Sequence, residues 1–402
     1  MKTVKHIAKY ALASIIIGLV CGLFGCIYNL IQDFVVSVRN SYSTNLFLIL
    51  MPIGGLLIVL VTKILKTENS GTDDVITAMR DPDKKTDAAF CASAFLSLSL
   101  TNLFESAMGR EAAAFQTAAP VAEFIRSKFF KDTDPCIIAS AAVAAGFASI
   151  WGLPGFGAVF AAELAFGVLQ WKALLAGVLA SSAANFIQPI LFKNVTAYPA
   201  LELGEFDAML LLKIIILACA CGMFARVHCY MLDFAGMCAG KIKNLYVRIF
   251  ALGALAALVC FLSGNTDYLC GFNGIINDAL SGKLLTESRI YFAFAAKLVI
   301  FAIVLKAGYK VGRLSQTLAV GALFGALIGG VALGMQPGIC ASLGIVCLLS
   351  AAYNTPAAAL VLLVEAFPCE SKILLIFYGF VAVAISRIVS GKCQIYAAQK
   401  LR

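Results

Sequence analysis

The chain has 402 residues, of which 61% are hydrophobic and only 13% are charged, and its formal net charge is +9. Soluble domains have about a quarter of their residues charged, so a soluble protein of this length could not hide so much apolar surface. Apolar runs that approach the ~20 residues needed to cross a bilayer must be helical, because no water there satisfies the backbone. The composition excludes a soluble protein and a β-barrel, and it predicts an all-α polytopic membrane protein.

The first apolar run extends from Ile7 to Ile31 and has no small-residue cleavage site near its end. It therefore predicts a retained first span and not a signal peptide. Lys2, Lys5 and Lys9 precede or open this run, so the positive-inside rule places the N-terminus in the cytoplasm. We expect a multi-pass protein of the cell inner (plasma) membrane. The positive net charge suits anionic lipid as well as an anionic substrate and does not distinguish them.

Further apolar runs follow along the chain, and a polar segment divides them into two sets. Runs of near-spanning length cover Leu46–Leu65, Ala88–Phe104 and Tyr291–Leu305. The segment Lys193–Asp207 contains a proline and a glycine and is typical of a connector. We therefore predict a first membrane repeat in residues 1–200 and a second in residues 201–402. No run outside these sets is long enough for a cytoplasmic regulatory domain, and none is expected.

Three landmarks of the first half recur about 200 residues later, in the same order. Gly109-Arg110-Glu111 is matched by Gly312-Arg313-Leu314, and Gly71 is matched by Gly274, both 203 positions later. Pro154 and Glu163, nine residues apart, are matched by Pro356 and Glu365 at an offset of 202. The recurrence indicates a duplicated membrane unit, and only its first copy has a glutamate beside the repeated Gly-Arg.

Several apolar segments are too short to span a bilayer, and they occupy matching positions of the two halves. The clearest are Ser70–Met79 and Asn273–Leu280. Short or glycine-interrupted segments at matching positions are the best sequence indicator of a binding site at the membrane midplane. A helix that begins inside the membrane leaves unpaired N–H groups and roughly half a positive charge at its start, so it favours an anion.

The order of these motifs resembles the CLC chloride channel and transporter family over about residues 10–402. The resemblance rests on a Ser-Gly before a short helix, Gly-Arg-Glu, Pro-x8-Glu, a glycine-led helix in the second half, and a final Gly-Lys motif that ends at Tyr396. It implies the CLC-type fold of two inverted-topology repeats with many tilted and partial helices. It also implies a homodimer in the lipid bilayer.

The resemblance assigns roles to individual residues. Glu111 takes the position of the gating glutamate, which occupies the anion site when ionised and leaves it when protonated. The anion-binding positions that it implies are Ser70, Gly71, Gly109, Arg110, Gly312, Arg313, Leu314 and Tyr396. Two of these have simpler alternatives: Ser70 as a helix N-cap, and Tyr396 as an interfacial anchor.

Some positions depart from the family pattern. Asp73 replaces a proline of the helix-D motif, and Arg313 stands where the family has an apolar residue. Arg313 either attracts the anion, extends to the interface, or pairs with Glu105 or Asp278. Leu164 occupies the position of the second carboxylate of proton-coupled members, for which Glu105 is a candidate replacement.

The carboxylates of the repeated Pro-x8-Glu motif have a different expected role. Glu163 and Glu365 lie at matching ends of the two repeated helices. We expect them to have structural or inter-helix roles.

The leading hypothesis is transmembrane transport of chloride or another small monovalent anion, with some proton coupling through Glu111. An uncoupled chloride channel is the alternative that Leu164 favours. A fluoride-type exporter is a third, against which Ser70 and the absence of a glutamate at position 313 both count.

Functions of other classes are less well supported by the motifs. The two histidines, His6 and His228, lack the partner motifs of an intramembrane hydrolase, so no enzyme activity is expected. A cation or amino-acid transporter would need carbonyl-rich unwound segments. The fourteen cysteines form no Cys-x-x-Cys pair, so no metal or cofactor is expected. The expected partners are a small anion, protons and lipid, with no nucleic acid.

Overall fold

The computed structural model describes residues 2–42, 44–104, 109–191, 198–263, 273–285 and 289–399. Within these ranges the chain is almost wholly helical, and the one β-type pairing is an isolated bridge between Leu201 and Cys369. The described part of the first half contains nine helices: α1 (Lys2–Asn40), α2 (Thr44–Ile64), α3 (Thr72–Ala78), α4 (Ala88–Leu103), α5 (Glu111–Gln116), α6 (Ala118–Phe129), α7 (Pro135–Trp151), α8 (Pro154–Phe166) and α9 (Trp171–Leu191).

The second half repeats this order. Its described elements are α10 (Ala208–Gly240), α11 (Leu245–Ser263), α12 (Asn273–Leu280), α13 (Arg289–Ala307), α14 (Arg313–Gly325), a π-helical segment (Ala326–Ala332), α15 (Pro337–Tyr353), α16 (Pro356–Ala366), α17 (Lys372–Ser390) and a 3-10 turn (Ala397–Gln399). Each half begins with a long helix and a spanning helix, followed by the short helix α3 or α12. The predicted duplication is confirmed, whereas the division at residue 200 stays a prediction.

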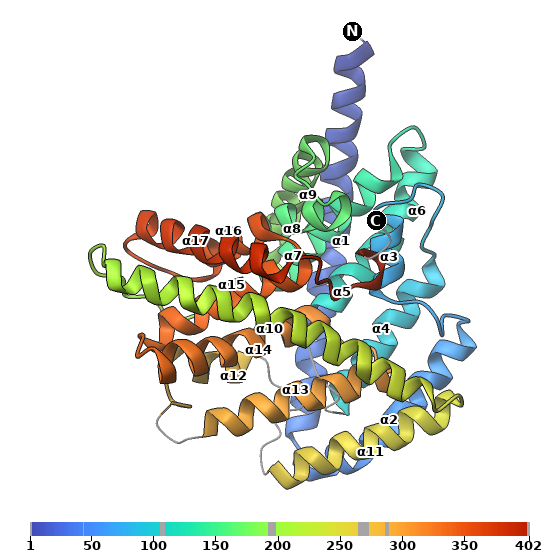
Figure 1. The fold of residues 1–402 in the computed structure, drawn as a ribbon. Coiled ribbons are helices and arrows are strands. Elements are labelled where there is room, and N and C mark those ends of the chain that lie inside the picture. Colours follow the sequence, from blue (N-terminus) through green and yellow to red (C-terminus); the bar gives the residue numbers. More distant parts are fainter. Residues whose placement is uncertain are drawn as a thin grey trace.

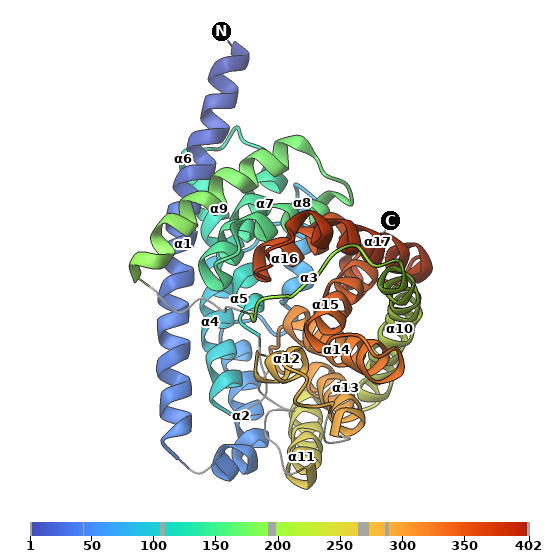
Figure 2. The same ribbon diagram turned by 90° about the vertical axis from the view of Figure 1, so that its left-hand side faces the viewer.

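The two halves lie across one another. In Figure 1 the long helix α1 runs upright, whereas its counterpart α10 runs across the molecule. Figure 2, turned by 90°, shows α1, α4 and α9 on one side and α10, α11 and α13 to α15 on the other. Helices α5, α7, α8 and α16 meet α14 and α15 where the two sides join, and nearly every residue of α7 and α15 is buried.

Helix boundaries follow from local sequence signals. Aspartates cap three helices: the side chains of Asp87, Asp134 and Asp207 accept hydrogen bonds from the first-turn N–H groups of α4, α7 and α10. Proline is the first residue of α7, α8, α15 and α16, where its missing N–H costs nothing. Helices α7 and α8 end at Gly152 and Gly167, which adopt the left-handed conformation.

Helices α8 and α16, which carry the repeated Pro-x8-Glu motif, cap each other. The carboxylate of Glu163 on α8 accepts hydrogen bonds from the Ala357 and Ala358 N–H groups at the start of α16, at 3.1 and 2.7 Å. Glu365 on α16 accepts from Gly155 and Phe156 at the start of α8, at 2.9 and 2.6 Å. The predicted structural role of this glutamate pair is confirmed.

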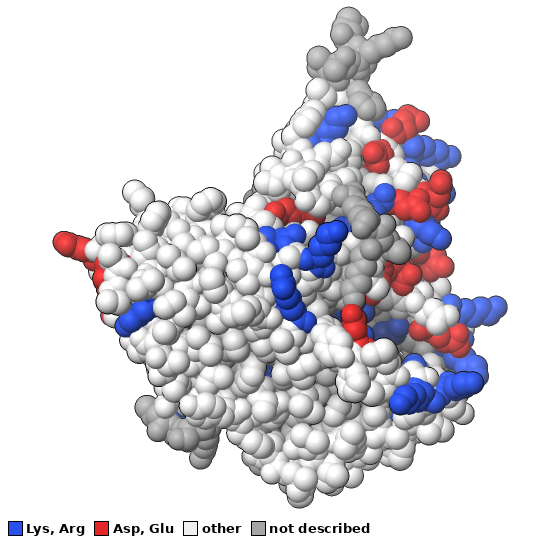
Figure 3. Space-filling model, viewed as in Figure 1, with Lys and Arg blue, Asp and Glu red and all other residues white. Residues whose placement is uncertain are grey.

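The outer surface is suited to lipid. Among the described residues, eight helices are long and apolar enough to cross a membrane. In Figure 3 the charged side chains of the visible face gather mainly along its right-hand edge, and the broad surface beside them is almost uncharged. The protein is a multi-pass membrane protein. Two spans differ in length from the prediction, since α1 extends to Asn40 and α4 has only 16 residues.

Candidate anion site at the start of helix α14

The carboxylate of Glu111 lies at the N-terminal end of α14. Glu111 is the first residue of α5 and is 1% exposed. Its Oε1 accepts a hydrogen bond from the Ser315 N–H at 3.0 Å, and its Oε2 accepts one from the Ser315 hydroxyl. The backbone of Leu314 also interacts with this carboxylate. An anionic group therefore already occupies the position that the unpaired N–H groups and dipole of α14 favour.

The two repeated glycines leave the space that this carboxylate fills. A Cβ on Gly312 would lie 1.9 Å from Glu111 Oε1, and a Cβ on Gly109 would lie 2.2 Å from Oε2. Gly109 also has φ +118°, a conformation that side chains rarely adopt. The residue that matches Glu111 in the second half is Leu314, which is fully buried, so of these two matched positions only the first supplies a carboxylate.

Tyr396 lies in a buried aromatic cluster beside the start of α14. It is 1% exposed, and its ring contacts those of Phe115 and Tyr353 edge-to-face, with centroids 6.2 and 5.2 Å apart. The Tyr353 hydroxyl lies 3.1 Å from the Thr317 hydroxyl on α14. The guanidinium of Arg313 lies over the Tyr396 ring, 5.2 Å from its centroid. Tyr396 is thus buried in the interior and is not an interfacial anchor.

A cavity of about 280 Å³ opens next to this cluster. It is lined by Ser70, Gly71 and Arg313 of the predicted anion-binding set, and by the acidic side chains of Asp73 and Asp74. Lys310 also lines it, and its Nζ donates a hydrogen bond to the Ser70 carbonyl at 2.6 Å. The N-cap of α3 is Gly71 and not Ser70, so the alternative of Ser70 as a helix cap is wrong.

Arg313 pairs with a residue that the sequence analysis did not propose as its partner. Its Nη2 lies 2.8 Å from Asp73 Oδ2, in the position where the family motif has a proline. Asp278 pairs instead with Lys283 at 3.6 Å, so the predicted Arg313–Asp278 pair is wrong. Glu105 lies outside the described residues. The sequence separation of 240 residues between Arg313 and Asp73 explains why spacing alone did not reveal the pair.

Arg110 has its side chain elsewhere. Its Nη1 donates to Asn29 Oδ1 at 3.1 Å, and its Nη2 pairs with Asp33, both on α1. The guanidinium therefore ties α5 to α1 and does not join Arg313 at the cavity. An anion-binding role for Arg110 at this site stays a prediction.

Leu164 contributes its backbone carbonyl to a contact with Arg80. Leu164 is fully buried, and its carbonyl accepts hydrogen bonds from Arg80 Nε and Nη2 at 3.2 and 2.6 Å. Arg80 Nη1 donates to the Ala398 carbonyl at 3.1 Å, so Arg80 joins the end of α8 to the turn after Tyr396.

The sequence did not reveal two contacts of the site. One is the pair of hydrogen bonds from Ser315 to Glu111, and the other is the ion pair between Asp73 and Arg313. Ser315 could have been identified, because a hydroxyl three residues after Gly312 falls in the first turn of the predicted helix.

Comparison with known proteins places the chain. A model of the family described as "Voltage gated chloride channel" matches residues 54–391. The chain is 25% identical over 410 residues to a "Chloride/fluoride channel protein" of Pseudomonas syringae pv. tomato, covering 98% of this chain and 87% of that protein.

Solved structures share the fold. A CLC-type fluoride/proton antiporter matches with a TM-score of 0.82 at 19% identity, covering 97% of each chain. A slow cyanobacterial Cl⁻/H⁺ antiporter matches with a TM-score of 0.82 at 15% identity, covering 96% of each. A eukaryotic CLC transporter matches with a TM-score of 0.78 at 17% identity, covering 98% of this chain and 74% of that one. The fold, the repeated landmarks and the family match agree, and the chain belongs to the voltage-gated chloride channel family.

Proposed function

We propose that this protein moves a small halide anion across the membrane, with Glu111 as its gate. The single observation that carries the proposal is the Glu111 carboxylate on the start of α14, held by the N–H and hydroxyl of Ser315. These are donors for any anion, because neutral N–H and O–H groups at a helix start bind negative charge without the trapping effect of a lysine. A halide and the carboxylate compete for the same donors.

The proposal includes proton coupling, because the carboxylate leaves most readily when it is neutral. An ionised carboxylate removed from its donors inside the membrane loses its only compensation, at a cost of several kcal/mol. Protonation removes that charge and frees the donors for the halide. One proton is then bound for each opening, which couples proton binding at Glu111 to halide movement.

Chloride is the first candidate substrate, and fluoride is the second. The curated relative is named for both ions, and the two solved structures of equal TM-score are one fluoride and one chloride antiporter. Ser70 lines the cavity beside the site, as the chloride assignment expects. We further propose a homodimer in the cell inner membrane, as the family resemblance implies.

The experiment compares the wild-type protein with Glu111→Gln in proteoliposomes that contain a halide gradient. Halide efflux and external pH are recorded together, first with chloride and then with fluoride. We expect the wild type to take up protons in step with halide efflux. Glu111→Gln mimics the neutral gate, so we expect halide flux with a flat pH trace.

Glu370→Gln, which alters an exposed glutamate on the same chain, serves as the control and should behave as the wild type. Proton uptake that persists in Glu111→Gln would remove Glu111 from the mechanism. A wild type that moves halide with no pH change would support the uncoupled channel instead.

A further inference from the structure

We propose that Arg313 is a second halide-binding group of this protein, and that Asp73 competes with the halide for it as an inner gate. The proposal rests on the proposed function and adds a site that Glu111 does not occupy. Asp73 and Arg313 are two positions at which the sequence departs from the family pattern. The structure brings these two departures together as one ion pair, 2.8 Å between Arg313 Nη2 and Asp73 Oδ2.

The ion pair lies between the cavity and the buried aromatic cluster. Both side chains line the cavity of about 280 Å³, which is large enough to hold a hydrated ion. On its other side the Arg313 guanidinium lies over the ring of Tyr396. An ion that enters from the cavity therefore meets this pair next to Tyr396.

Asp73 is held in place from two directions. Its Oδ2 pairs with Arg313, and its Oδ1 accepts a hydrogen bond from the Ala398 N–H at 3.2 Å, in the turn that follows Tyr396. The carboxylate is thus fixed by the backbone and does not depend on Arg313 for its position. A carboxylate that keeps one anchor can give up the guanidinium to another anion and remain in place.

The charges around the cavity balance. The lining contains three basic side chains (Arg248, Lys310 and Arg313) and three acidic ones (Glu68, Asp73 and Asp74). Asp74 accepts a hydrogen bond from the Gly71 N–H at 2.7 Å, and Lys310 donates to Ser70. Within the described residues, the buried Nε of Arg248 has no hydrogen-bond partner. A halide beside Arg313 therefore enters a cavity whose lining has no net formal charge and in which the Arg248 Nε–H is left without an acceptor.

The partial exposure of the Arg313–Asp73 pair allows a halide to compete with Asp73 for Arg313. The Arg313 and Asp73 side chains are 22% and 29% exposed, so the pair is neither sealed from water nor fully screened. A partly exposed pair is worth roughly 1 kcal/mol or less, which a halide at working concentration can overcome. Because a guanidinium has several donors, the halide can also share it with Asp73 during entry.

The test is halide binding by isothermal titration calorimetry on purified full-length protein in detergent, with chloride and then fluoride. Asp73→Asn removes the competing charge, so we expect halide affinity to rise roughly threefold to tenfold. Arg313→Gln removes the site, so we expect affinity to fall by a similar factor. The double variant should equal Arg313→Gln, because Asp73 acts only through Arg313.

Glu68→Gln is the matched control, since it removes the same charge from the cavity lining but does not contact Arg313, and its affinity should remain within about twofold of wild type. Asp73→Glu keeps the competing acid and should remain close to wild type. It also separates a loss of competition from a loss of folding, which size-exclusion profiles check for every variant.

The proposal is overturned if Asp73→Asn leaves affinity unchanged, or if it raises affinity equally in the Arg313→Gln background, which would indicate a general charge effect. The result is distinct from a failure of the proposed gate. Halide binding at Arg313 with normal proton coupling in Glu111→Gln would refute the gate and leave this site standing.

Discussion

The Glu111 carboxylate is buried, and hydrogen bonds replace the water that it has lost. We therefore expect two states, one held by these donors when ionised and one released when neutral. A carboxylate at 1% exposure is stable only where donors replace water, and Ser315 supplies two of them from one residue. The N–H of Ser315 is fixed in the helix, whereas its hydroxyl can rotate toward another acceptor. The hydroxyl is therefore the adjustable part of the hold on Glu111.

Removal of that hydroxyl should loosen the gate. We expect Ser315→Ala to weaken the hold on the Glu111 carboxylate by about 1.5 kcal/mol, the lower value for a hydrogen bond to a charged group. The halide loses the same donor but can move toward the Ser315 N–H, whereas the tethered carboxylate cannot, so the apparent halide affinity in calorimetry should rise modestly.

Ser315→Thr keeps a hydroxyl at the same position and should bind halide as the wild type does. If Ser315→Ala and Ser315→Thr bind halide equally, the hydroxyl does not contribute to the hold on Glu111. The N–H of Ser315 would then hold the carboxylate alone.

Some residues of the site could be predicted from the sequence, whereas the partner of one of them could not. Glu111 and Gly312 were both predicted, because each belongs to a copy of the repeated Gly-Arg motif and a helix starts at that motif. The partner of Arg313 was not, since Asp73 is 240 residues away and its position replaces a proline in the family motif. Pairing across the two repeats depends on how they pack, which no local pattern specifies.

At the scale of elements, the repeated Pro-x8-Glu motif works as an exchange of caps. Proline begins α8 and α16 without an N–H to satisfy, and the N–H groups of the next two residues are bonded by the glutamate of the other helix. Each repeat therefore supplies what the other lacks. The spacing of nine residues between proline and glutamate makes this exchange possible, because it places the carboxylate near the C-terminal end of a short helix.

Removing one of these carboxylates should destabilise the junction between the repeats. A glutamine in place of Glu163 or Glu365 loses the charge and one of two backbone contacts, at a cost of about 1–2 kcal/mol. We expect the apparent Tm in detergent to fall by several degrees for either variant.

Glu370→Gln, at an exposed position just after α16, should leave the Tm unchanged. An unaltered Tm in both Glu163→Gln and Glu365→Gln would show that the caps do not contribute to stability. A decrease in only one of them would show that the two halves of the exchange are unequal.

Helices α14 and α15 approach so closely that only glycine fits between them. A Cβ on Gly344 would lie 2.3 Å from the Gly321 carbonyl oxygen and 2.6 Å from the Gly325 Cα. These are backbone atoms that cannot rotate away. The start of α14, where Glu111 binds, is thus carried by a helix that is fixed against α15 by small residues, as is common in membrane helix packing.

Gly344→Ala should therefore be costly. We expect a loss of about 1–3 kcal/mol from overpacking, which exceeds the gain of up to ~1 kcal/mol in helix propensity. The measurement is the apparent Tm in detergent.

Gly240→Ala, at the end of α10, is the matched control, because nothing lies within 4 Å of its added Cβ. It should be neutral or slightly stabilising. Equal Tm values for the two alanine variants would contradict close packing at Gly344.

At the scale of the whole molecule, the duplicated order of helices was predictable, and their arrangement was not. Offsets of 202 and 203 residues fix which helices correspond, since each landmark has the same local chemistry in both copies. The short helix α12 even matches the predicted range Asn273–Leu280. How α1 and α10 cross depends on long-range packing, and α1 continues beyond Ile31 through polar residues that contact other helices, such as Gln32 and Asp33.

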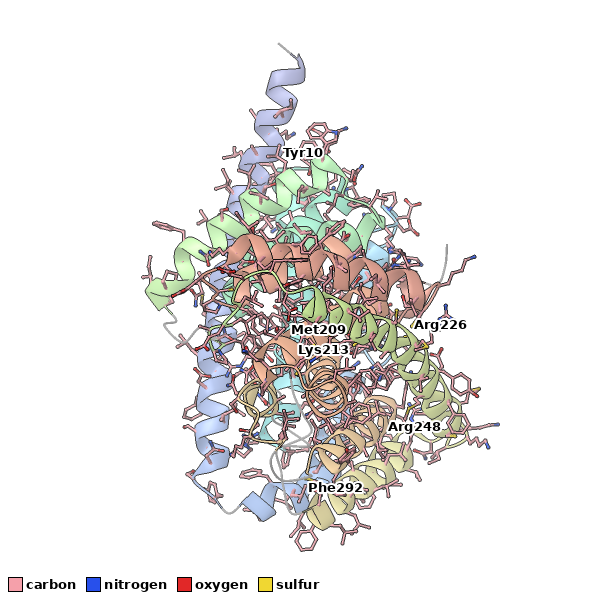
Figure 4. All side chains as sticks on the ribbon, turned by 60° about the vertical axis from the view of Figure 1, so that its left-hand side comes forward. Tyr10, Met209, Lys213, Arg226, Arg248 and Phe292 are labelled. Carbon is pink, nitrogen blue, oxygen red and sulfur yellow. The ribbon has the colours of Figure 1, made fainter. Side chains whose placement is uncertain are left out.

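The orientation in the membrane can be inferred from contacts at one end of α1. Lys9 Nζ lies 2.6 Å from Asp132, and the Asp134 N–H donates to the Tyr10 hydroxyl at 2.7 Å, so residues 130–134 lie at the N-terminal end. Figure 4 places Tyr10 and Phe292 at opposite ends of the molecule. Lys128 and Lys131 belong to this N-terminal end, which adds positive charge to that side.

The positive-inside rule then places residues 130–134 and the N-terminus in the cytoplasm, and the far end of α1 outside. Fusions after Lys131 and after Ser41, made with green fluorescent protein and with alkaline phosphatase in a bacterial host, test this. We expect fluorescence only after Lys131 and phosphatase activity only after Ser41, because each reporter is active on one side of the membrane. A reversed pattern would place residues 130–134 outside and would contradict the orientation inferred from the charges at this end of α1.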